Sequence, residues 1–145
     1  MNFQFGNRSK EELQSCHADL QLVLEESLKN SCVDFGVSEG QRSLEKQLEY
    51  FRTGKSKIDG IKKKGKHNLQ PSEAADIYVF VEGKPKLAYD ERHMAYLAGV
   101  ITATANRLYS ERKISHKVRG GGNWDMNGEI ILDQDFDDLP HFELI

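Results

Sequence analysis

Hydrophobic and polar positions along the chain repeat with two different periods, and these periods predict its elements. Between residues 10 and 29, apolar side chains recur at helical spacing behind a Ser9 to Glu12 segment that fits a capping box. A second stripe follows Asp90, whose side chain can cap a helix in which the stripe spans about four turns. The stripes consist of Leu13, Cys16, Leu20, Val23, Leu24 and Leu28, and of Met94, Leu97, Ala98, Ile101, Ala105 and Leu108.

Shorter segments have the alternation of β-strands. In residues 75–81, aliphatic side chains occupy every second position and Asp76 lies on the other side. Further strands are predicted at residues 33–37, 129–132 and 141–145, and a short helix at 43–52. Helices mixed with short strands, without regular β–α–β alternation, predict an α+β fold: a small antiparallel sheet with helices packed on one face.

The last predicted strand indicates where chemistry could lie on this sheet. Alternation places Phe142 and Leu144 on one face, and His141 and Glu143 on the opposite face. If this strand pairs inside the sheet, burial of the two apolar side chains holds the chain end in place. His141 then projects onto the accessible face. Asp76 has the same arrangement in its own strand, so a site opposite the helices is expected.

Composition adds limits to this picture. The 145 residues suit one domain, 1–145, and a hydrophobic content of 38% with 30% charged residues is typical of a soluble globular protein. No apolar run is long enough for a membrane span, and the start lacks the apolar core of a signal peptide. We therefore expect a cytoplasmic chain in which Cys16 and Cys32 are reduced, buried thiols.

Charge is unevenly distributed along the chain. The net charge is −3, yet six lysines crowd residues 55–66 among glycines, which predicts a mobile, solvated loop. This loop could attract an anionic polymer or peptide carboxylates, or it could be a solvated loop without a ligand. No aromatic residues interleave with the lysines to stack bases, which argues against nucleic acid as a partner.

His67, Asp76 and His141 are the candidate metal ligands. Two histidines and a carboxylate suit a catalytic zinc ion, which typically takes three protein ligands and leaves a fourth position for water. Asp138 precedes His141 by three residues, and Pro140 disfavours helical geometry at Leu139, so a turn could bring Asp138 to the same site. Five histidines and many acids also produce such triplets by chance, so the surrounding motifs have to decide. His17, His93 and His116 lack a partner pattern and are expected to be non-ligands.

Six motifs run in order along most of the chain. They are NFQFG at residues 2–6, EGQRS at 39–43, GKS at 54–56, KHN with PSEAAD at 66–76, GGNWD at 121–125 and FDDLPHFEL at 136–144. Together they resemble the zinc D-alanyl-D-alanine carboxypeptidase and L-alanyl-D-glutamate endopeptidase family, particularly its small single-domain phage endolysins.

This resemblance implies roles for individual residues. His67, Asp76 and His141 correspond to the zinc ligands, and the family's hedgehog/DD-peptidase-like fold places zinc on the sheet face opposite the helices. Asp138 corresponds to the catalytic acid, which takes a proton from the attacking water, and Arg42 to the arginine that holds a substrate carboxylate or carbonyl. Two departures, Gly65 in place of the usual serine and Asn123 in place of aspartate, bear on substrate preference and loop chemistry.

Residues after the glycine run carry two further candidate functions. Asn123, Asp125, Asn127 and Glu129, with Gly128 at the sixth position, follow the spacing of a calcium loop, although Gln134 stands where a bidentate glutamate belongs. The alternative is an Asn-Gly hairpin turn with acidic neighbours. Trp124 could line a substrate cleft or pack beneath the glycine run.

The resemblance favours a zinc metallopeptidase that hydrolyses peptidoglycan stem peptides, an L-alanyl-D-glutamate endopeptidase acting as a phage endolysin. The alternatives are a D-alanyl-D-alanine carboxypeptidase and, from a different class, a non-catalytic module that binds the cell wall or calcium. The expected cofactors are Zn²⁺ and, at the loop described above, Ca²⁺. The expected partner is the stem peptide, reached by a monomer that is made in the host cytoplasm and acts on the cell wall after release.

Overall fold

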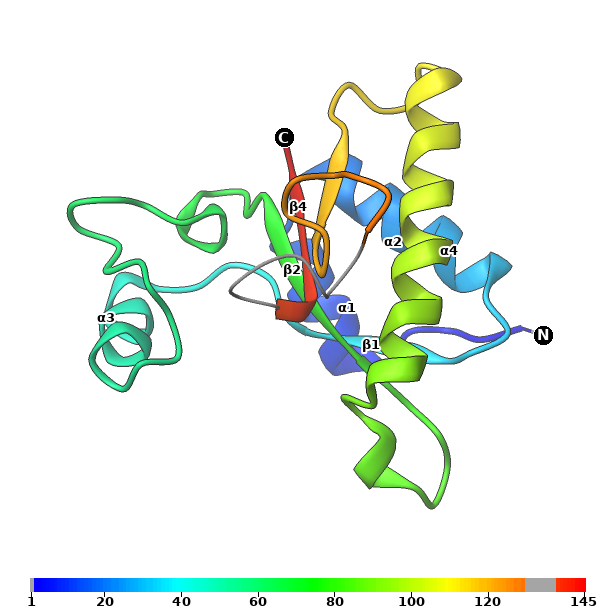
Figure 1. Cartoon of the computed structure of the whole chain (residues 1–145), viewed down its shortest axis with the longest axis horizontal. Coiled ribbons are helices and arrows are strands. Elements are labelled where there is room, and N and C mark those ends of the chain that lie inside the picture. The colour runs from blue at the N-terminus through cyan, green and yellow to red at the C-terminus, as the bar shows by residue number, and fades with distance from the viewer. Residues whose placement is uncertain (1, 130–137) are drawn as a thin grey trace.

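A four-stranded antiparallel sheet forms the centre of the computed structural model, which describes residues 2–129 and 138–145 (Figure 1). The strand order is β1-β2-β4-β3, with β1 at Phe35–Glu39, β2 at Ala74–Val79, β3 at Val118–Gly121 and β4 at Asp138–Leu144. The helices are α1 (Asn7–Gln14), α2 (Ala18–Asn30), α3 (Leu44–Arg52) and α4 (Glu91–Ser110), with 3₁₀ turns η1 (Lys66–Asn68) and η2 (Pro85–Leu87). The predicted α+β class is confirmed.

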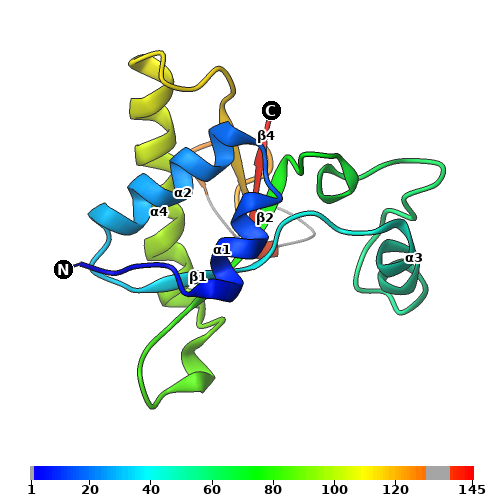
Figure 2. The same cartoon turned by 180° about the vertical axis from the view of Figure 1, so that it is seen from behind.

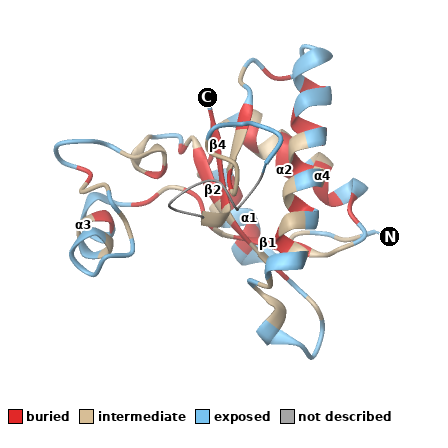
Figure 3. Ribbon diagram, in the orientation of Figure 1, coloured by how far each residue is buried: buried red, intermediate tan, exposed pale blue. Residues whose placement is uncertain are grey.

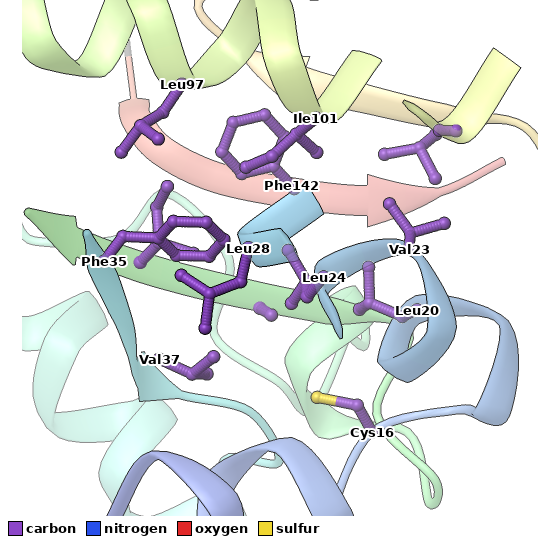
Figure 4. Close-up of a cluster of buried hydrophobic side chains, with 14 of the residues drawn as sticks. Cys16, Leu20, Val23, Leu24, Leu28, Phe35, Val37, Leu97, Ile101 and Phe142 are labelled. Atoms are coloured by element: carbon purple, nitrogen blue, oxygen red, sulfur yellow. The ribbon is translucent and has the colours of Figure 1, made fainter. Parts of the chain in front are cut away.

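The core lies on one face of the sheet, where helices cover it. Ile77 of β2 and Phe142 of β4 are completely buried in this core. Figure 4 shows Phe142 beside Leu97 and Ile101 of α4 and near Leu24 and Leu28 of α2. The buried surfaces of these two helices face each other and the sheet, while their outer surfaces are exposed (Figure 3). The periodic stripes that predicted the helices therefore supply the side chains that the sheet buries.

The C-terminal strand lies inside the sheet, between β2 and β3. Hydrogen bonds continue to the end of the chain, because the amide of Leu144 donates to the Glu73 carbonyl (2.8 Å) and that of Ile145 to the Lys117 carbonyl (2.9 Å). Phe142 and Leu144 are fully buried on the helix side. The chain end is thus held by a ladder on each side and by apolar burial beneath it.

The prediction of one helix over residues 10–29 is wrong, because two helices occupy this segment. The break at Ser15 to His17 pairs with a distant segment: the His17 amide donates to the Ser72 carbonyl (2.7 Å), and the Ser72 amide donates to the Ser15 carbonyl (2.9 Å). The His17 ring then caps α2, since its Nδ1 accepts from the Asp19 amide at 3.0 Å. Tertiary pairing overrides the continuous helical periodicity here.

The predicted capping box is also wrong, because α1 begins at Asn7 and leaves Ser9 and Glu12 inside the helix. Their side chains bind the first strand and its exit instead. Ser9 Oγ accepts from the Val37 amide (3.1 Å), and Glu12 Oε2 accepts from the Gly40 amide (2.9 Å). The two residues hold α1 against β1 and stabilise the turn that leads toward the functional site.

The two cysteines differ, so the expectation of two buried thiols is only half right. Both are free, but Cys32 is exposed, with its Sγ 2.9 Å from the hydroxyl of Tyr96. Burial raises the pKa of the Cys16 thiol to about 12, which makes it an inert core group. The strand predicted at residues 129–132 lies outside the described residues, apart from Glu129.

The segment from α3 through the lysine-rich loop extends to one side of the sheet (Figures 1 and 2). Gln47 points inward and is 1% exposed, whereas Leu44 and Phe51 are about half exposed, at 50% and 46%. Most of the lysines in residues 55–66 are exposed, as predicted. Within residues 2–129 and 138–145, no helix is both long and apolar enough to cross a membrane.

Replacement of Phe142 by alanine should destabilise the fold by about 3–5 kcal/mol, because it leaves a cavity beneath the central strand. Urea unfolding followed by circular dichroism would measure the loss. Phe80→Ala is the matched control, since Phe80 is 53% exposed next to the end of β2, and it should cost less than about 1 kcal/mol. Equal losses in the two variants would contradict the placement of the core.

Candidate metal centre and cleft

Three candidate metal ligands converge on the sheet face opposite the helices. Asp76 of β2 and His141 of β4 are direct cross-strand partners, so their side chains lie next to each other. His67 reaches the same point from η1, which hydrogen bonds hold beside the turn that leaves β1. Both histidines are buried, at 5% and 8% exposure. The structure brings together three residues that are up to 74 positions apart in the sequence.

The ligand atoms form a nearly equilateral triangle. His67 Nε2 lies 3.3 Å from Asp76 Oδ1 and 3.2 Å from His141 Nδ1, and the latter two atoms are 3.2 Å apart. Ligands about 2.0–2.1 Å from a tetrahedral ion would be roughly 3.3–3.4 Å apart, whereas an octahedral face at the same bond length would have edges of roughly 2.8–3.0 Å. The triangle is closer to tetrahedral coordination.

The outer nitrogen of each imidazole determines what its inner nitrogen offers. His67 Nδ1 lies 2.7 Å from the Gly40 carbonyl, which can only accept, so this nitrogen carries the proton and Nε2 presents a lone pair inward. His141 Nε2 lies 2.8 Å from Glu143 Oε1, which places its proton outward in the same way. Two lone pairs and a carboxylate oxygen therefore converge on one point, which is the donor set of a metal site.

Without a metal ion, protons have to balance this convergence of acceptors. Burial alone would lower the pKa of His141, but hydrogen bonds to Asp76 and Glu143 outweigh it and raise the pKa to about 9. Burial would raise the pKa of Asp76, but hydrogen bonds from His141 and His67 keep it well below its usual range. The metal-free centre therefore holds a cationic His141 against an ionised Asp76, and a metal ion would displace that proton.

A second group of metal-binding residue types is less buried and has structural contacts of its own. Within the part of the chain that the structure describes, the only other such cluster consists of His17, Asp19 and His116. His17 Nδ1 is occupied as the cap of α2, and His116 Nδ1 donates to Asp19 Oδ2 at 2.8 Å. Through these contacts the three side chains form a hydrogen-bonded tie between α2 and the turn before β3.

Asp138 lies at the edge of the triangle because of an irregularity in the sheet. Gly120 pairs with Phe142 but the next residue, Gly121, pairs with Asp138, so β4 bulges through Pro140. In a regular strand, residues three apart would face opposite ways, whereas the bulge places Asp138 Oδ2 3.9 Å from His141 Nδ1. A Cβ atom at Gly121 would overlap the Asp138 carbonyl oxygen, so this approach requires glycine.

The environment of Asp138 favours proton transfer. Burial raises the pKa of its carboxyl, and the neighbouring negative charge of Asp76 adds to the effect. A carboxyl with a raised pKa at the edge of the triangle holds a proton more readily than an ordinary carboxyl, which suits a group that accepts and returns one.

Arg42 lies beside the triangle but is extensively bonded. Its Nε donates to Glu39 Oε1 (2.6 Å) and its Nη1 to Gln47 Oε1 (2.9 Å), and its Nη2 is 3.8 Å from Asp76 Oδ2. The guanidinium also stacks over the ring of Tyr50 at 4.7 Å. These contacts fix its plane at the wall of the site.

A cleft with a volume of about 750 Å³ opens over the triangle. Arg42, Asp138 and Trp124 line it together with the three candidate ligands, and the Trp124 and His141 ring centres are 5.4 Å apart. One wall comes from the lysine-rich loop, through Lys55, Lys57, Lys63, Lys64 and Lys66. The structure thus places that loop and Trp124 at the same cleft as the candidate ligands.

The candidate calcium loop is described only in its first part. Asn123 Oδ1 accepts from the Asn127 amide (3.2 Å), Asn127 Nδ2 donates to Asp125 Oδ2 (2.7 Å), and Asn127 Oδ1 accepts from the Glu129 amide (2.7 Å). These bonds are those of an Asx-rich turn. Gln134 and its neighbours lie outside the described residues, and calcium binding stays a prediction from the sequence.

Two residues of this centre were not identified as functional from the sequence. The alternation of β4 placed Glu143 on the same face as His141, and that signal was sufficient to suggest a contact. Arg119 had only a weak signal, its position just before the glycine run. It lies opposite Glu143 on β3, and Nη2 of Arg119 is 2.7 Å from Glu143 Oε2.

Known proteins resemble this chain in sequence and in fold. The family model of phage L-alanyl-D-glutamate peptidases matches residues 1–145. Among solved structures, the chain is similar to the L-Ala D-Glu endopeptidase ChiX of Serratia marcescens, with 28% sequence identity and a TM-score of 0.70 over 98% of this chain and 90% of that one. A comparison with curated proteins gave no significant match.

Zn²⁺ binding should release about one proton per chain at pH 7, because the pKa of His141 is raised to about 9 in the metal-free centre and the metal needs its neutral form. Affinity should therefore rise with pH, by at most about tenfold per unit below that pKa. Calorimetric titration in buffers of different ionisation enthalpy would measure the released protons. Binding without proton release would contradict the expected state of His141.

The same titration separates the two histidine groups. His67→Ala should abolish tight binding of one Zn²⁺ per chain. The control His116→Ala should keep it, since His116 belongs to the hydrogen-bonded tie between α2 and the turn before β3. Loss of tight binding in His116→Ala alone would place the metal at the cluster of His17, Asp19 and His116 instead.

Proposed function

Because the chain belongs to the family of phage L-alanyl-D-glutamate peptidases, we propose that it hydrolyses the L-alanyl-D-glutamate bond of peptidoglycan stem peptides as a zinc enzyme. The observation that supports zinc is the triangle of two imidazole nitrogens and one carboxylate oxygen with edges of 3.2–3.3 Å. His67, Asp76 and His141 would hold the ion. Three protein ligands leave one tetrahedral position for water or substrate, which is typical of catalytic zinc.

The bound ion would polarise the scissile carbonyl and lower the pKa of water at the centre. Asp138 is proposed as the general base and acid. It accepts a proton from the attacking water and returns that proton to the amine of D-glutamate as the peptide bond breaks. Its raised pKa and its 3.9 Å separation from His141 Nδ1 support this role.

Arg42 is proposed to bind an oxygen of the substrate. A guanidinium has five N–H donors. Nε and Nη2 contact Glu39 and Nη1 donates to Gln47, which leaves the second N–H of Nη1 for a carbonyl or carboxylate. Because those bonds and the Tyr50 ring already fix its orientation, little side-chain entropy would be lost when substrate binds. Trp124 is proposed to contact the peptide on the opposite wall.

The charge of the substrate fits the lysine wall of the cleft. D-glutamate linked through its amine has two carboxyl groups, and only one of them can continue the chain. Unless it is amidated, the other stays ionised within a few bonds of the scissile amide. Lys55, Lys63 and Lys64 line the cleft and form no ion pair among the described residues. We propose that they attract this peptide electrostatically.

The biological role proposed for this activity is host lysis by a monomer that reaches the cell wall after release from the cytoplasm. A D-alanyl-D-alanine carboxypeptidase would use the same centre, but the family and the structural neighbour both favour the endopeptidase. Mass analysis of digested peptidoglycan separates the two activities. Cleavage at L-alanyl-D-glutamate gives a stem peptide without L-alanine, whereas the carboxypeptidase releases only D-alanine.

Asp138→Asn should lower kcat by roughly 10²–10⁴-fold and leave zinc content unchanged, because the amide cannot accept the proton. Release of stem peptide from purified peptidoglycan, followed by mass spectrometry, would measure the rate. Glu111→Gln, a neutralisation on the exposed end of α4, is the control and should keep full activity. Wild-type rates in Asp138→Asn would remove Asp138 from the mechanism.

Simultaneous replacement of Lys63 and Lys64 by alanine should raise KM severalfold at low salt with little change in kcat. The difference should shrink as ionic strength rises, because exposed charges are screened. Lys10→Ala with Lys29→Ala is the matched control, since it changes net charge equally at a surface away from the cleft. An identical KM change in both double variants would show that overall charge, rather than the lysine wall, is responsible.

A further inference from the structure

A chain of contacts runs from the candidate ligand His141 along the cleft side of the sheet. Glu143 uses one carboxylate oxygen for His141 Nε2 (2.8 Å) and the other for Nη2 of Arg119 (2.7 Å). Glu143 is 7% exposed, so its charge depends on these two partners. Arg119 and Glu143 face each other in the β3–β4 register, which fixes the pair through the backbone.

The same arginine continues to the wall of the cleft. Nη1 of Arg119 donates to the carbonyl of Trp124 (3.2 Å), and its guanidinium lies 5.5 Å from the Trp124 ring centre. The Trp124 ring in turn lies beside the His141 ring. The contacts close a circuit of His141, Glu143, Arg119 and Trp124, which joins a candidate metal ligand to the residue proposed to contact substrate.

We propose that Glu143 and Arg119 are positioning residues that couple metal binding to the placement of the cleft wall. Glu143 keeps the outer proton of His141 in place, so that Nδ1 presents its lone pair to the metal. Arg119 holds the Glu143 carboxylate in its orientation, and its planar fork holds the Trp124 segment at the same time. This inference rests on the proposed zinc peptidase function and adds the residues that orient its centre.

The atoms involved give each residue a separate effect. A glutamine at position 143 has nearly the same shape, but its amide can turn and donate to His141 Nε2. His141 would then carry its proton on Nδ1, directed at the metal. Lysine at position 119 would keep a cation next to Glu143 but lacks the second arm that reaches the Trp124 carbonyl.

Zinc affinity, measured by competition with a chromogenic chelator, tests the first role without any peptide substrate. Glu143→Gln should weaken zinc binding by roughly 10–100-fold, the range for carboxylates that support a ligating histidine. Arg119→Met should also weaken it, and the double variant should bind no more weakly than Glu143→Gln alone, since both act through one chain. Long-range ¹⁵N spectra of the metal-free protein above pH 9 should show His141 losing its single Nε2–H form in Glu143→Gln.

The kinetic experiment tests the second role. Arg119→Lys should keep zinc affinity close to wild type and raise KM for the stem peptide. Arg107→Met, which removes an arginine from an exposed ion pair with Glu111 on α4, is the matched control and should change neither quantity.

A merely structural ion pair predicts different results. In that case Glu143→Gln and Arg119→Met would lower the unfolding temperature of the metal-free protein, and the two decreases would add in the double variant. Zinc affinity and the His141 tautomer would stay unchanged. Either result would overturn the proposal. A wild-type protein that binds zinc but releases no stem peptide would instead refute the proposed function, and the affinity measurements would still test the positioning roles.

Discussion

The pairing of β4 between β2 and β3 is the constraint on which the rest of the structure depends. One face of this strand buries Phe142 and Leu144 against the helices, and the other carries His141 and Glu143. A one-residue shift of register would exchange the two faces and expose the apolar side chains. The free energy of burying the core therefore also holds His141, a candidate ligand, in position.

The candidate metal centre adds an electrostatic cost to the fold. The outer ring nitrogens of both histidines direct their protons at the Gly40 carbonyl and at Glu143, so the inner nitrogens face each other, and Asp76 contributes an ionised oxygen at nearly the same distance. Such a concentration of acceptors is unfavourable unless a cation or a proton joins it. The core on the other side of the sheet supplies the stability that keeps these groups together, which explains why the centre lies on rigid strands and on a tightly bonded turn.

The cleft has walls of different character. On the side of α3, a fixed guanidinium and exposed lysines give a positive surface, although the chain as a whole carries a net charge of −3. On the opposite side lie Arg119, which belongs to β3, and Trp124, which comes shortly after it. Glu143 connects them to the candidate metal centre. An anionic peptide between these walls would have its charge next to the lysines and Arg42 on one side. On the other side it would contact Trp124, which Arg119 and Glu143 connect to His141.

The sequence by itself determined the elements with strong periodicity and, through the order of its motifs, the identity of the candidate ligands. The stripe after Asp90 and the alternation around Asp76 and His141 are local properties, because side-chain direction follows from backbone geometry. They were sufficient to predict an α+β sheet with a site opposite its helices.

Only the tertiary structure decided the features that depend on contacts between distant segments. Pairing with Ser72 divides the first predicted helix, the bulge opposite Gly121 turns Asp138 toward His141, and the β3 register brings Arg119 to Glu143. Local periodicity cannot predict any of these features, because it indicates which face of an element a side chain occupies and not which distant segment packs or pairs with that element. Neither the depth of the cleft nor the position of the lysine loop at its wall could be read before the chain was folded.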